Sequence, residues 1–100
     1  RVELVRISGR IDSSNAAEFD RVLKEVASRK QNVVLEMSGV DYISSAGLRA
    51  MVALLRECKK QKGDVVLAKP SERVVEVLAL AGLDTLFQVQ SSETAAVGSF

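Results

Sequence analysis

The chain passes from a predicted strand to a predicted helix within Tyr42–Arg49, which reads Tyr-Ile-Ser-Ser-Ala-Gly-Leu-Arg. An apolar run precedes this stretch, and apolar residues at helical spacing follow it. The first backbone N–H groups of a helix have no partner within the helix, and the helix dipole favours negative charge there. A serine at this junction is therefore either a helix cap or a place where a phosphoryl group is well tolerated.

Apolar runs on both sides of this junction predict buried strands over residues 2–7, 32–37 and 65–67. Gly9 is expected to break the first strand, and residues 38–41 are expected to turn the chain after the second. Residues 87–89 are the candidate for a last strand.

Helical patterns separate these strands. The first begins in the polar cluster Asp12–Asn15. Asn15 and Glu18 have the spacing of a capping box, although any of the four polar residues could be the cap. The second follows the double serine and is expected to end with Gly63 as its C-cap. A third is expected to begin at Ser71 and end at Gly82-Leu83, and Ser92 is the candidate start of a terminal helix. Strands alternating with helices predict an α/β domain with parallel pairing and a mostly buried sheet.

Composition excludes several classes of function. The net charge of +1 argues against nucleic-acid binding, and no stretch approaches the roughly 18 apolar residues of a membrane span. The chain contains no histidine, which removes the common activator of catalytic nucleophiles and the common metal ligand. No glycine-rich phosphate loop is present, so we predict no enzyme activity, cofactor or metal.

The single cysteine, Cys58, cannot form an internal disulfide, which fits a reducing cytoplasm. Its place in a helix predicts an inert side chain, although Lys59 and Lys60 could lower its thiol pKa.

Three ordered segments carry a family resemblance: Ser8–Asp12, residues 33–48 and residues 74–87 with Ala-Gly-Leu-Asp at 81–84. Together they resemble STAS domains, which include the bacterial anti-sigma factor antagonists and a C-terminal domain of anion transporters. The resemblance implies one α/β domain over residues 1–100, with a four- to five-stranded mixed sheet and helices packed mainly on one side.

The resemblance also implies a non-enzymatic switch. In such antagonists, a serine at the start of the second helix is phosphorylated by a partner that is both serine kinase and anti-sigma factor. The unphosphorylated antagonist binds that partner and frees a sigma factor, and a phosphatase would restore the unmodified form. The acceptor falls on Ser45, and a family aspartate near it falls on Asp12.

Two residues depart from the family pattern. Ser44 stands where the best-known antagonists have aspartate, which makes it a competing acceptor, and Arg49 stands where a small residue is frequent. Gly47 is either needed for close approach or merely tolerated in the first helical turn. The candidate partner surface comprises Asp12, Ser44, Ser45, Gly47, Arg49, Arg56 and Lys60.

Two other classes of function are also compatible with parts of the sequence. STAS-like domains also serve as interaction subunits of lipid-transport ATPases or as cytosolic parts of anion transporters, without a phospho-switch. A serine hydrolase is the weaker alternative, because Ser45 has no histidine and the nucleophile elbow would need glycine at Ile43.

Overall fold

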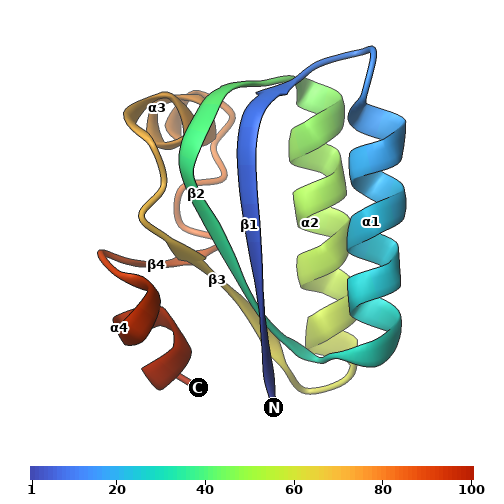
Figure 1. Cartoon of the computed structure of the whole chain (residues 1–100), viewed down its shortest axis with the longest axis vertical. Coiled ribbons are helices and arrows are strands. Elements are labelled where there is room, and N and C mark those ends of the chain that lie inside the picture. Colours follow the sequence, from blue (N-terminus) through green and yellow to red (C-terminus); the bar gives the residue numbers. More distant parts are fainter.

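Four strands and four helices alternate along the chain in the computed structural model, which describes residues 1–100 (Figure 1). In order they are β1 (Val2–Ile11), α1 (Ala16–Arg29), β2 (Asn32–Ile43), α2 (Ser45–Lys60), β3 (Asp64–Ala68), α3 (Glu72–Leu80), β4 (Gln88–Gln90) and α4 (Glu93–Gly98). No helix is both long and apolar enough to cross a membrane. The predicted α/β class is confirmed.

The four strands form one sheet in the order β1-β2-β3-β4, and all three pairings are parallel. The sheet is therefore not mixed, and this part of the expectation is corrected. Each connection between neighbouring strands carries a helix that returns the chain to the same end of the sheet, so no antiparallel pair arises.

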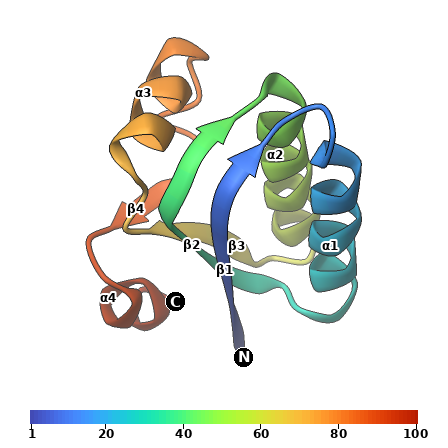
Figure 2. The ribbon, with the colours of Figure 1, turned by 45° about the horizontal axis from the view of Figure 1, so that its top comes forward.

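Alternate residues of the strands face two separate cores. On one face, Val33, Leu35, Val65 and Leu67 pack with buried residues of α1, α2 and α3 in a cluster of 20 residues. On the other face, Val34, Val66 and Ala68 pack with Ala96 of α4. Figure 2 shows α1 and α2 together on one side of the sheet and the short α4 on the other. Helix packing mainly on one side is thus confirmed.

Both strands that lead to the double serine are longer than predicted. Gly9 does not end β1: it adopts a φ of 85° next to a register shift, and β1 continues to Ile11. Residues 38–41 do not turn the chain either, because Gly39 and Val40 remain paired with β1. Hydrogen bonds between the two strands satisfy their backbone groups. Bulges at the two register shifts allow this pairing to continue.

Three of the predicted helix ends are confirmed. The hydroxyls of Ser71 and Ser92 accept hydrogen bonds from the backbone N–H groups of Val74 and Ala95. Gly82 adopts a φ of 74° after α3, and the N–H of Leu83 donates to the carbonyl of Leu78 at 2.8 Å.

Two predicted caps are corrected. Asn15 does not cap α1 with its side chain, because its Oδ1 accepts from the N–H of Asp12 instead, and Glu18 pairs with Arg21. After α2, Lys62 takes the left-handed position with a φ of 66°. Gly63 is required for a different reason: a Cβ there would lie 1.8 Å from the carbonyl oxygen of Gln31.

Candidate functional site

The candidate site forms where β2 passes into α2, beside the end of β1. Ile11 and Ile43 are register partners, and the backbone N–H of Ser44 donates to the carbonyl of Ile11 at 2.8 Å. Because the strands are parallel, the loop after β1 and the start of α2 lie at the same end of the molecule (Figure 1). The structure therefore places the loop that begins at Asp12 beside the double serine.

Ser44 is the N-cap of α2. Its backbone is extended, and its hydroxyl accepts a hydrogen bond from the N–H of Gly47 at 3.2 Å. Ser45 is the first residue of the helix, is exposed, and its hydroxyl makes no hydrogen bond within the chain. The interpretation of Ser45 as a simple cap is wrong, because the cap position belongs to its neighbour.

Gly47 is buried against the ends of both strands. A Cβ at this position would lie 2.8 Å from Cγ2 of Ile11 and 2.8 Å from Cγ1 of Ile43. Of its two predicted roles, close approach is the one that the geometry supports. Gly47 lets α2 start directly on the strand ends, and so it positions the serines without forming surface itself.

Asp12 is held by the loop that follows β1. Its Oδ1 accepts from the hydroxyl of Ser14 at 2.6 Å and from the N–H of Ser14 at 3.0 Å. The Arg10 Nε lies 3.7 Å from its Oδ2. These groups lower the pKa of Asp12, with the Ser14 hydroxyl as the largest cause. Asp12 thus carries a fixed negative charge beside the start of α2.

The remaining candidates share one exposed stripe of α2. Ser45, Arg49, Arg56 and Lys60 are separated by four, seven and four residues, which places them on one helical face, and all four are exposed. We call this face, with the exposed Ala53 between them, the α2 stripe. Lys60 Nζ lies 3.6 Å from Glu57, whereas Arg49 and Arg56 form no ion pair.

Sequence reasoning missed one pair beside the site. Arg10 lies over the ring of Tyr42, with its Cζ 4.6 Å from the ring centroid. The two residues are partners across β1 and β2, but two register shifts precede that partnership. Residue spacing alone therefore could not have aligned them.

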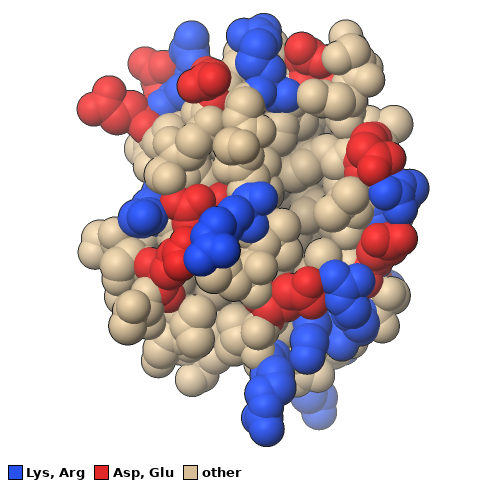
Figure 3. All heavy atoms as spheres, in the orientation of Figure 1, with Lys and Arg blue, Asp and Glu red and all other residues tan.

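Charges of both signs are interspersed over most of the face seen in Figure 3, with basic side chains gathered at its lower end. Near α1, for example, Arg21 lies 2.6 Å from Glu18 and 2.9 Å from Glu25. A mixed surface of this kind favours contacts with a specific partner over non-specific attraction to a polyanion.

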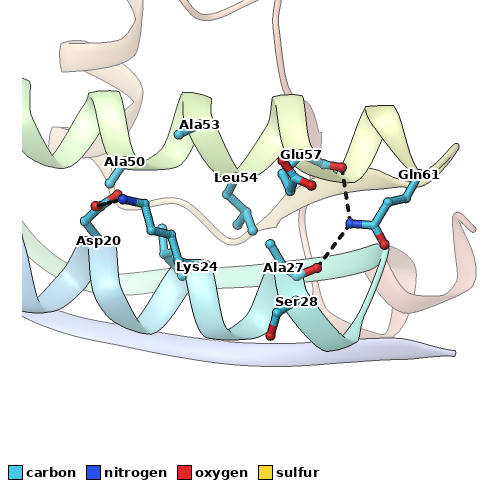
Figure 4. Close-up of a pocket in the computed structure, with 10 residues that line it drawn as sticks. Asp20, Lys24, Ala27, Ser28, Ala50, Ala53, Leu54, Glu57 and Gln61 are labelled. Atoms are coloured by element: carbon cyan, nitrogen blue, oxygen red, sulfur yellow. Dashed lines mark hydrogen bonds and ion pairs between the residues drawn. The ribbon is translucent and has the colours of Figure 1, made fainter.

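One hollow of the surface does not coincide with the candidate site. It is a groove of about 490 Å³ between α1 and α2, with Leu23 and Leu54 among its lining residues (Figure 4). Its polar groups already have partners: Lys24 lies 3.0 Å from Asp20, and the Gln61 amide donates to two carbonyls. Ala53 of the α2 stripe lines it, but none of the predicted site residues does, and no cluster of potential metal ligands occurs in the structure.

Residues 1–96 match the family model described as the STAS domain. The chain belongs to the STAS domain family. This STAS domain is 33% identical over 95 residues to BtrV of Bordetella bronchiseptica, whose assignment as an anti-sigma factor antagonist is itself provisional. That match covers 94% of this chain and 82% of the relative.

Two further matches extend the comparison. The anti-sigma-B factor antagonist of Bacillus subtilis is 27% identical over 93 residues, which cover 93% of this chain and 85% of the relative. A crystal structure from Thermotoga maritima, also provisionally assigned as an anti-sigma factor antagonist, superposes with a TM-score of 0.88 at 25% identity. The superposition covers 98% of this chain and 86% of the Thermotoga chain.

The predicted family and fold of this STAS domain are thus confirmed, and the three relatives described here are assigned as anti-sigma factor antagonists, two of them provisionally. The two curated relatives are named as antagonists, and anti-sigma factor antagonists are non-enzymatic binding proteins. The domain is therefore grouped with binding proteins and not with enzymes.

Proposed function

We propose that this STAS domain is an anti-sigma factor antagonist whose binding is switched off by phosphorylation of Ser45. The observation that carries the proposal is the division of roles at the junction. Ser44 caps α2 through Gly47, so the adjacent Ser45 hydroxyl is exposed and has no structural hydrogen bond to lose. The antagonist relatives supply the class of partner.

Phosphorylation would add about 1.5 to 2 negative charges at neutral pH. At the first residue of α2 these charges meet the positive end of the helix dipole, so the fold tolerates them. A partner surface shaped for a neutral serine does not, because it would bury additional negative charge next to the charged Asp12. A loss of about 2.7 to 4.1 kcal/mol would weaken binding by 100- to 1,000-fold.

The partner is an anti-sigma factor that is also the serine kinase, and a phosphatase resets the switch. ATP belongs to that kinase, and the STAS domain is its substrate in the cytoplasm. The partner contacts the loop before α2 and the α2 stripe, where Arg49 and Arg56 have no internal ion pair and complement an acidic surface.

The intact mass of the protein recovered from its own organism tests the proposal, with and without phosphatase treatment. We expect a species heavier by one phosphate that disappears with phosphatase and in Ser45→Ala. Ser44→Ala is the matched control and retains the phosphate. If the wild type stays unmodified across growth and stress conditions, the switch is excluded and a constitutive STAS binding subunit replaces it. A phosphate that survives in Ser45→Ala but not in Ser44→Ala would move the acceptor.

A further inference from the structure

Arg49 lies one helical turn beyond Ser45 on the α2 stripe. Residues four apart on a helix are surface neighbours, with about 5 to 6 Å between their Cβ atoms. Both residues are exposed, and Arg49 makes no ion pair or hydrogen bond with its side chain. A cation without a partner therefore stands beside the proposed acceptor hydroxyl.

We propose that Arg49 is the internal counter-ion of phosphorylated Ser45, an inference that rests on the phosphorylation proposed above. A single modification then changes the α2 stripe twice. It adds a dianion at Ser45, and it withdraws the guanidinium of Arg49 from the partner. The residue that attracts an acidic partner in the unmodified protein is occupied internally in the modified one.

The other cations near the site are less suited to this role. Arg10 already lies 3.7 Å from Asp12 and over the ring of Tyr42, so it would have to give up both contacts. Lys60 already has an acidic neighbour, because its Nζ lies 3.6 Å from a carboxylate oxygen of Glu57. Arg56 is eleven residues from Ser45, a rise of about 16 Å along the helix, and is out of reach.

Helix geometry also favours the direction of this pair. An acidic group four residues before a basic one is the better orientation on a helix, because it agrees with the dipole. A guanidinium can donate two parallel hydrogen bonds to phosphate oxygens. The nearby carboxylate of Asp12 already accepts two hydrogen bonds from Ser14. Its basic neighbour is Arg10, so it competes with the phosphate for Arg10 and not for Arg49.

A titration of the phosphate tests the pair without any partner protein. Phosphoserine is placed at position 45 of the full chain during synthesis, by genetic encoding, and its second pKa is followed by phosphorus NMR at low salt. A cation next to the phosphate stabilises the dianion and lowers that pKa. We expect Arg49→Gln to raise it by about 0.4 units, and the matched control Arg56→Gln to leave it unchanged within about 0.1 units.

Two more variants make the outcome decisive. Arg49→Lys should restore part of the shift, because it keeps the charge but loses the bidentate geometry. Arg10→Gln tests the alternative counter-ion on β1. Equal pKa values in Arg49→Gln and Arg56→Gln would overturn the proposal, as would a larger shift in Arg10→Gln. Circular dichroism of each unphosphorylated variant checks that the fold is intact.

This experiment separates the inference from the proposed function. The phosphate is installed without the kinase, so a protein that is never phosphorylated in its organism would refute the switch and leave the titration result standing. Conversely, a phosphorylated protein with no shift in Arg49→Gln would retain the switch and refute the role of Arg49.

Discussion

The hydroxyl of Ser44 accepts a hydrogen bond from the backbone N–H of Gly47 at 3.2 Å. This contact separates two adjacent serines into a structural one and an exposed one. It satisfies one of the free N–H groups at the start of α2, so the helix needs no contribution from the Ser45 side chain.

Ser44→Ala should therefore reduce the free energy of unfolding by about 1 kcal/mol, the usual cost of a lost N-cap. Ser45→Ala should change it by less than about 0.5 kcal/mol, because an exposed side chain without contacts is removed. Urea unfolding of the two variants beside wild type measures both. Equal losses in the two variants would contradict the assignment of the cap.

Gly47→Ala should destabilise the fold by about 1 to 3 kcal/mol, because its new methyl group would lie 2.8 Å from both Ile11 and Ile43. Gly98→Ala is the matched control, since no atom lies within 4 Å of a Cβ at that helical position. It should be neutral or slightly stabilising, because alanine favours helix. The midpoints of thermal unfolding compare the two, and a neutral Gly47→Ala would show that the strand ends can move.

Arg56→Glu should slow association with the cognate anti-sigma factor while the unfolding midpoint stays within error. Arg56 is exposed and makes no ion pair, so its loss costs no internal contact. Reversal of a charge at the edge of an interface acts mainly on the association rate and weakens at high salt. Surface plasmon resonance at two salt concentrations measures this. An unchanged rate at low salt would exclude the α2 stripe as the partner surface.

Glu93→Gln should make the free energy of unfolding less sensitive to acidic pH. Arg6 donates to both carboxylate oxygens of Glu93 at 2.9 Å, and these hydrogen bonds lower its pKa in the folded state. The pair thus stabilises the fold above the ordinary carboxyl pKa of about 4, and this contribution is lost as pH falls through the lowered value.

The stability difference between wild type and Glu93→Gln is therefore expected at pH 7 and should shrink below about pH 4. Urea unfolding across this range measures it. The control is Asp84→Asn, because Asp84 is exposed and forms no ion pair. A difference that persists undiminished at pH 2 would show that Glu93 acts through packing and not through its charge.

Cys58 should resist modification in the folded protein. Its side chain is fully buried, and burial raises the pKa of its thiol despite the neighbouring Lys59. An aromatic disulfide reagent should react slowly in buffer and rapidly in urea, as followed by absorbance. Fast labelling of the native protein would indicate local opening of α2.

Local signals in the sequence were sufficient for most helix starts. Ser71 and Ser92 cap their helices as predicted, because an N-cap depends on a side chain and a backbone group only three residues apart. Asn15 failed this rule because its amide found closer partners in the Asp12 loop and the Arg10 carbonyl.

Strand lengths could not be read from the same local signals. Residues 38–41 have the composition of a turn, yet they extend β2, because β1 lies alongside and supplies hydrogen-bond partners. Similarly, nothing near Gly63 in the sequence indicates that Gln31 will approach it.

The sequence by itself determined the alternation of strands and helices, the mostly buried sheet and the location of the double serine, because these depend on residue periodicity and short-range caps. Only the tertiary structure decided that Ser44 caps α2, that Gly47 is wedged against Ile11 and Ile43, and that Arg10 lies over Tyr42. The physical reason is register. Contacts between β1 and β2 depend on the register of the two strands and on the bulges that shift it. The packing of the whole core sets that register.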